Sequence, residues 1–177
     1  MPQQILSPRR LVQLLSLFVF LFLTGCASTG DFSQLRPGIS TEADVSKAGG
    51  KPTYVWQNSD GTRTLEYSAQ PDDGFGCVML TLDAAGKLTK IENAITPANI
   101  ARIQPGMAQD AVRRILGTPR SKVFFPLAGE DVWDWNTSDA SAIISFERFN
   151  VHFKAGVVAR TSWRHIDPGS CSFISPC

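Results

Sequence analysis

The string Leu35-Arg36-Pro37-Gly38-Ile39 returns later in the chain as Ile103-Gln104-Pro105-Gly106-Met107, and this repetition decides the fold. Each string is followed by a helical segment that ends at a Gly-x-Pro triplet, Gly50-Lys51-Pro52 in the first half and Gly117-Thr118-Pro119 in the second. Further matches keep the same order at an offset of 67 to 71 residues. Because matches in register rarely arise by chance, the chain is expected to contain two tandem units.

The two units, at residues 32–96 and 97–167, are each expected to hold two short helices followed by three or four antiparallel strands. The first helix of each unit is predicted at Phe32–Leu35 and at Ala98–Ile103. The helix that follows Gly106 carries its apolar residues at spacings of i, i+3, i+4, i+7 and i+8, which places them on one face. These residues are Ala108, Ala111, Val112, Ile115 and Leu116.

The strands are predicted from the alternation of apolar and polar residues. Val78, Leu80 and Leu82 share one face, for example, and glycine turns at 83–86 and 154–156 predict hairpins. We therefore expect an α+β protein in which the two units join into one continuous eight-stranded sheet with the helices on one face. Residues 168–177 are expected to form an irregular tail.

The N-terminus is typical of an export signal. Arg9 and Arg10 precede a 13-residue stretch from Leu11 to Leu23 that is mostly Leu, Phe and Val. As a helix this stretch would span about 20 Å, which is shorter than a hydrocarbon core of ~30 Å. A signal peptide at residues 1–25 is therefore favoured over a transmembrane helix.

The string Leu23-Thr24-Gly25-Cys26 resembles the lipobox of bacterial lipoproteins. This resemblance implies cleavage before Cys26, acylation of Cys26, and a short lipidated tether at residues 26–31. An ordinary signal peptide with a chance cysteine is the alternative. Ala27, in the place where aspartate retains Gram-negative lipoproteins at the inner membrane, implies an outer-membrane location facing the periplasm.

Three cysteines remain after Cys26: Cys77, Cys171 and Cys177. An oxidising periplasm permits disulfides, and three thiols allow one internal bridge with one thiol left over. The spacing of these cysteines in the sequence does not show which two of them form the disulfide. No Cys/His spacing of the zinc type is present, so no metal or other cofactor is expected.

The net charge of the chain indicates which classes of partner it can bind. Two of the 17 Lys and Arg, and none of the 16 Asp and Glu, lie in residues 1–25, which leaves a net charge of −1 for the mature chain. A nearly neutral chain has no electrostatic attraction to nucleic acid. We expect partners at the membrane, through the lipid, and among envelope proteins.

Catalytic motifs are absent from the sequence, which contains no HExxH, GxSxG or Walker string. Ser162, His165 and Asp167 could be assembled into a triad on paper, but such sets arise in any chain of this composition. His152 and His165 are read as surface or sheet-edge residues, and the acidic pairs Asp72-Asp73 and Glu130-Asp131 as loop residues. The protein is therefore expected not to be an enzyme. A hydrolase would require a histidine in a pocket beside a nucleophile.

The aromatic residues offer a binding surface. Most are expected to pack the sheet against the helices. Because side chains along a strand alternate between the two faces of the sheet, some of the aromatic side chains must point away from the helices. Trp56, Phe125 and Trp163 are the candidates for partner binding, since exposed aromatic side chains anchor protein interfaces.

The order of motifs in the second half resembles the SmpA/OmlA domain, the family of BamE, a lipoprotein of outer-membrane β-barrel assembly. The matching residues are Pro105-Gly106-Met107, Val112, Leu116-Gly117-Thr118-Pro119, Trp133–Trp135 and Phe153–Val157. A looser copy precedes them, whereas the assembly subunit has one such domain. Two tandem copies also resemble the architecture of the β-lactamase inhibitor protein.

These resemblances imply a membrane-anchored, non-catalytic scaffold that binds proteins in outer-membrane protein assembly or envelope integrity. The alternative is an inhibitor-like module that binds a periplasmic enzyme, such as a β-lactamase or a cell-wall enzyme.

Overall fold

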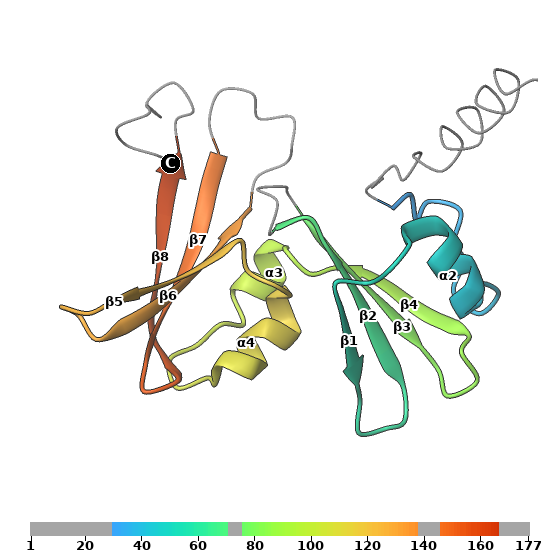
Figure 1. Cartoon of the computed structure of the whole chain (residues 1–177), viewed down its shortest axis with the longest axis horizontal. Helices are drawn as coiled ribbons and strands as arrows, with labels where there is room; N and C mark the ends of the chain where they lie inside the picture. Colours follow the sequence, from blue (N-terminus) through green and yellow to red (C-terminus); the bar gives the residue numbers. More distant parts are fainter. Residues whose placement is uncertain (1–29, 71–75, 138–145, 167–177) are drawn as a thin grey trace, which may run out of the picture.

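The computed structural model describes residues 30–70, 76–137 and 146–166, and Figure 1 shows how their elements are arranged. The first half consists of α2 (Glu42–Gly49), β1 (Tyr54–Gln57), β2 (Arg63–Ser68), β3 (Cys77–Leu82) and β4 (Leu88–Asn93). The second half consists of α3 (Pro97–Ile100), α4 (Gln109–Leu116), β5 (Ser121–Phe125), β6 (Glu130–Asn136), β7 (Phe146–Lys154) and β8 (Val157–Ile166). Each half contains a four-stranded antiparallel sheet whose strands follow chain order. The expected α+β class is confirmed, and each half has four strands where three or four were expected.

The two Pro-Gly strings make the same backbone contacts in both halves. The Gly38 nitrogen donates to the Leu88 carbonyl at 2.7 Å, and the Gly106 nitrogen donates to the Val158 carbonyl at 2.8 Å. Both glycines have positive φ, 80° and 88°, a conformation that a Cβ disfavours. Each turn therefore joins the chain ahead of a helix to the first residues of the last strand in its sheet.

The two longer helices, α2 and α4, end at the glycines that the sequence predicts, whereas α3 ends at Ile100, earlier than the predicted Ile103. The Asp44 nitrogen donates to Thr41 Oγ1 at 3.4 Å, and the Thr41 nitrogen donates to Asp44 Oδ2 at 2.8 Å, which completes a capping box at α2. At the other end, Gly50 closes α2 with φ 67° and Gly117 closes α4 with φ 76°. The turns predicted at 83–86 and 154–156 are also present, between β3 and β4 and between β7 and β8.

The first predicted helix of the first unit is wrong. Residues Phe32–Leu35 form a single turn, closed by one hydrogen bond of 3.1 Å from the Leu35 nitrogen to the Phe32 carbonyl. Pro37 follows at once, and the residue before a proline avoids helical geometry, so there is no room for a second turn. Its counterpart α3 forms because Thr96 caps it and Pro97 stands at its first turn.

The expectation of one joined sheet is also wrong. The two sheets share no strand pairing among the described residues, and α3 and α4 lie between them in Figure 1, with α2 on the far side of the first sheet. Cys77 and Met79 of β3 share one core cluster with Val112 and Leu116 of α4. The first sheet is apolar on both faces and must be covered on both. α2 covers one face through Val45, and α4 covers the other.

The core of the second half lies beneath α4. Its buried side chains come from one face of β6, β7 and β8, as alternation predicts: Trp133, Trp135, Phe149, Val151, Phe153 and Val158. The opposite face of this sheet carries no helix in the described part of the chain, so it is the open face of the molecule.

Candidate functional site

Trp56 lies at the junction between the two halves. Only 5% of Trp56 is exposed, and its Nε1 donates to Glu66 Oε2 at 3.2 Å. The guanidinium groups of Arg113 and Arg114 lie 5.3 and 4.5 Å from the centroid of its ring system. Strand alternation places Trp56 on the face of the first sheet that α4 covers. The interpretation of Trp56 as a partner-binding residue is therefore corrected, since it stabilises contacts inside the molecule.

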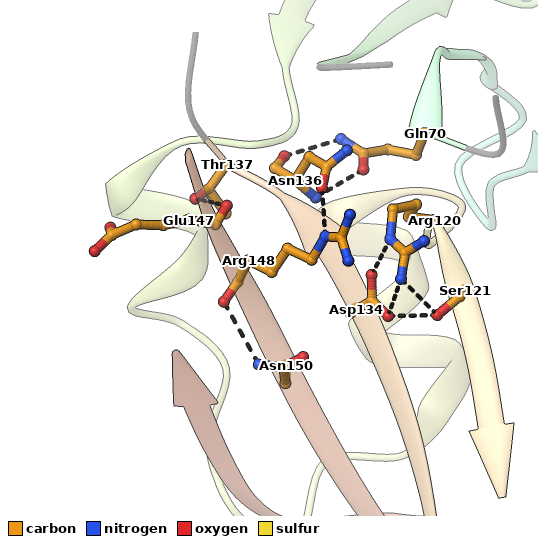
Figure 2. A network of polar contacts seen from close by, with 9 residues as sticks. All are labelled: Gln70, Arg120, Ser121, Asp134, Asn136, Thr137, Glu147, Arg148 and Asn150. Carbon is orange, nitrogen blue, oxygen red and sulfur yellow. Dashed lines mark hydrogen bonds and ion pairs between the residues drawn. The ribbon is translucent and has the colours of Figure 1, made fainter. Parts of the chain in front are cut away.

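A second junction joins the end of β2 to the second sheet, as Figure 2 shows. The side chain of Gln70 donates through Nε2 to the Asn136 carbonyl at 3.0 Å, and its Oε1 accepts from the Asn136 nitrogen at 2.8 Å. Arg148 Nε then donates to Asn136 Oδ1 at 3.0 Å. Gln70, Asn136 and Arg148 are all buried. These polar groups connect the halves at a defined register, in addition to the apolar packing around α4.

Cys77 is a free thiol in the described structure and is buried in the same interface. Burial raises the pKa of the Cys77 thiol well above its ordinary value, so it stays protonated and is a poor nucleophile. Cys171 and Cys177 lie outside the described residues, so the proposed disulfides stay predictions. Cys26, the site of predicted lipidation, lies outside them as well.

The hairpin between β5 and β6 exposes apolar side chains to solvent. We call Val123, Phe124, Phe125 and Leu127 the hairpin patch; all four are exposed, Leu127 completely. β5 is an edge strand of the second sheet, and in Figure 1 the hairpin projects away from the body of the molecule. Contiguous exposed apolar side chains on an edge strand are typical of an interaction surface.

Phe125 and Trp163, two of the predicted partner-binding residues, both border one hollow. Trp163 on β8 is 53% exposed, Phe125 is 49% exposed, and both line a hollow of about 480 Å³ on the second sheet. Its other apolar lining includes Ala128 and Val132. Trp163 pairs with Phe149 across β7 and β8, with 5.1 Å between their ring centroids. The assignment of Phe125 and Trp163 to partner binding stays a prediction.

The floor of this hollow is polar. His152 Nδ1 lies 3.0 Å from Glu130 Oε2, and His152 Nε2 lies 2.9 Å from Ser162 Oγ. Arg160 Nη2 donates to Glu130 Oε2 at 2.9 Å. The hydrogen bond from His152, aided by the Arg160 charge, holds the pKa of Glu130 below its ordinary value. Because an ionised carboxylate can only accept, Nδ1 of His152 donates to Glu130. His152 Nε2 lies near two groups, since Arg160 Nη1 is also 3.2 Å away.

Sequence reasoning missed this cluster. It paired Ser162 with His165 and Asp167, but His165 is exposed and Asp167 lies outside the described residues. It also placed Glu130-Asp131 in a loop, whereas both residues begin β6 and Glu130 is buried. Alternation along β7 places His152 on the sheet face opposite Phe149, Val151 and Phe153. The missing information was the register of β6 against β7 and of β7 against β8, which decides the neighbours of His152.

Among the described residues, no three His, Cys, Asp or Glu gather in a way that could hold a metal ion. No helix in the described ranges has the length and apolar character needed to cross a membrane.

Comparison with known proteins addresses the second half of the chain. No curated protein matched the sequence. A family model matched the segment that runs from the end of β4 to Ser162 and so includes the hairpin patch and the hollow. The comparison supports neither a family assignment for the first half nor the likeness to the β-lactamase inhibitor protein, and the inhibitor role gains no support from it. Residues 92–162 match the model of the outer membrane protein assembly factor BamE domain.

Proposed function

We propose that this protein is a lipid-anchored scaffold of the outer membrane that faces the periplasm and binds proteins during outer-membrane protein assembly. The match of residues 92–162 to an assembly-factor domain supports a role in outer-membrane protein assembly. The resemblance of residues 23–26 to a lipobox supports the anchor at Cys26. We propose that residues 32–96 and 97–167 are duplicated units, because their Pro-Gly turns make equivalent backbone contacts.

The observation that carries the proposal is the hairpin patch within the matched segment. Its side chains are exposed on both faces of an edge strand, with Phe124 on one face and Phe125 on the other. An extended segment of a partner can pair with the free edge of β5 and place its own apolar side chains against the patch. The open edge supplies backbone hydrogen bonds, and the aromatic side chains supply apolar contact area.

Site-specific photocrosslinking in native envelopes tests this role. A photoreactive phenylalanine analogue replaces Phe124, and a matched variant carries it at Val55, an exposed residue on edge strand β1 of the first sheet. We expect adducts with outer-membrane assembly proteins at position 124 and none with them at position 55. Absence of such adducts at position 124, or equal adducts at both positions, contradicts the proposal.

A further inference from the structure

The start of the described chain is packed directly onto the first half of the molecule. A Cβ added to Gly30 would lie 2.5 Å from the Gly49 Cα atom, so the two backbones approach each other closely at the end of α2. A Cβ added to Gly49 would collide with the Phe32 ring. That ring packs in turn on Tyr67, with 4.9 Å between the ring centroids. The chain is therefore attached to the folded body from Gly30 onwards.

The link between this attachment point and the proposed lipid anchor is short. Only Ala27, Ser28 and Thr29 separate Gly30 from Cys26. Even when fully extended, a link of four residues spans at most about 14 Å. The proposed acyl chains hold Cys26 at the bilayer surface, so Gly30 stays within that distance of the lipid headgroups. A body on so short a link cannot turn every face towards the membrane.

The surface beside Gly30 is suited to contact with lipid headgroups. Gly30 and Lys51 border one hollow of about 250 Å³, and Lys51 is exposed. An ammonium group close to a bilayer is attracted to the lipid phosphates. The nearby carboxylate of Asp31 contacts its own backbone, since its Oδ1 accepts from the Ser33 nitrogen at 3.0 Å.

The hairpin patch lies at the other end of the molecule. In Figure 1, α2, onto which Gly30 packs, forms one end of the described molecule, and the hairpin between β5 and β6 projects from the opposite end. The two sheets and α4 lie between them. Contact of the α2 end with the bilayer therefore directs the hairpin patch away from the lipid.

We infer that the surface around Gly30 and Lys51 rests against the phospholipid headgroups of the membrane that holds the Cys26 acyl chains. This inference rests on the proposed lipid anchor. The first half of the chain, to which no family is assigned, then acts as a rigid spacer. It fixes the distance and the direction of the hairpin patch relative to the membrane, and it leaves the patch open to a partner in the periplasm.

Fluorescence quenching in the acylated full-length protein tests this orientation. A fluorescent noncanonical amino acid replaces Lys47, which is exposed two residues before Gly49, and in a matched variant it replaces Leu127 of the hairpin patch. Each variant is inserted from mild detergent into vesicles of phosphatidylethanolamine and phosphatidylglycerol, some of whose headgroups carry a nitroxide, a quencher of short range. We expect a loss of emission at position 47 and none at position 127, relative to vesicles without nitroxide.

A longer link tests whether the short tether is the cause. Inserting ~16 Gly and Ser residues between Ser28 and Thr29 adds about 20 Å of r.m.s. reach. The fold and the anchor are unchanged, so the variant should still float with the vesicles, but the loss of emission at position 47 should largely disappear.

The outcomes separate this inference from the anchor itself. Protein that floats with the vesicles but shows equal emission losses at positions 47 and 127, or no loss at position 47, overturns the orientation and leaves the anchor in place. An unchanged loss at position 47 after the insertion overturns the role of the tether. Protein that does not float with the vesicles overturns the anchor and the orientation together.

Discussion

Glu66 accepts a hydrogen bond from the backbone nitrogen of Thr118, with 2.6 Å between that nitrogen and Oε1, and this contact joins the two sheets across the end of α4. The carboxylate is completely buried, and its other oxygen accepts from Trp56 Nε1 at 3.2 Å. One buried acceptor therefore satisfies two donors, one from each half of the chain. A buried polar group is stable only when its partners are in place, so Glu66 defines how the halves fit together.

Replacing Glu66 with alanine is expected to destabilise the protein by about 3 kcal/mol, because two buried donors lose their acceptor. Urea denaturation followed by circular dichroism measures the change. The control is Glu92→Ala on β4, where the side chain is exposed and pairs with exposed Lys90; a change of at most about 1 kcal/mol is expected there. Equal losses for the two variants would show that the Glu66 contacts do not hold the halves together.

The glycines that end α2 and α4 allow a matched comparison. Gly50 and Gly117 have similar backbone angles, φ 67° ψ −140° and φ 76° ψ −166°, but a Cβ at Gly50 meets open space. A Cβ at Gly117 would overlap Cys77 Sγ and lie 3.2 Å from Met79 Cε. Both Gly→Ala variants should lose about 1–2 kcal/mol to backbone strain.

Gly117→Ala should lose a further 1–3 kcal/mol, roughly, from overpacking of the interface. Thermal and urea unfolding of the two single variants measure the difference. Adding Cys77→Ala should recover part of the additional loss, because the overlapping sulfur is gone. If Gly50→Ala costs as much as Gly117→Ala, the close approach of α4 to β3 is not the cause.

The lowered pKa of Glu130 predicts a pH-dependent contribution to stability. A carboxyl whose folded pKa is below its unfolded value, 4.5, stabilises the native state above that value. The contribution disappears as the pH falls through the folded pKa. Glu130→Gln should therefore lower the melting temperature at pH 7, and the difference from wild type should shrink towards pH 3. A difference that is constant between pH 7 and pH 3 would rule out the ionised carboxylate as its source.

The proposed lipid anchor predicts a change of location without a change of fold. Cys26→Ser removes the acylated thiol, and the variant should leave the outer-membrane fraction and appear in the soluble periplasmic fraction. Its melting temperature should equal that of wild type, since Cys26 precedes the described domain by four residues. Retention of the serine variant in washed outer membranes would contradict anchoring through Cys26.

Much of the fold could be predicted because its signals are local. The Pro-Gly turns, the capping box at Thr41 and the glycines that end the helices depend on backbone angles and on neighbours within a few residues. The one failed helix, at Phe32–Leu35, was predicted by analogy with the second unit, although Pro37 limits that segment.

The candidate site was predicted only in part. Some exposed aromatic residues were expected, and Phe125 and Trp163 are exposed, but Trp56 is buried. No residue near Trp56 in the sequence indicates that a helix from the other half covers it. The contacts that cover it come from Arg113 and Arg114, more than 50 residues away.

Alternation along a strand tells which residues share a face, and residue type tells where a turn or cap forms, because both depend on the geometry of adjacent peptide units. The separation of the sheets by α4 and the meeting of His152 with Ser162 and Glu130 depend on packing and on strand register. These are contacts between segments distant in the chain, and their geometry follows from how two apolar surfaces exclude water together. No single segment encodes them, so they were visible only in the folded protein.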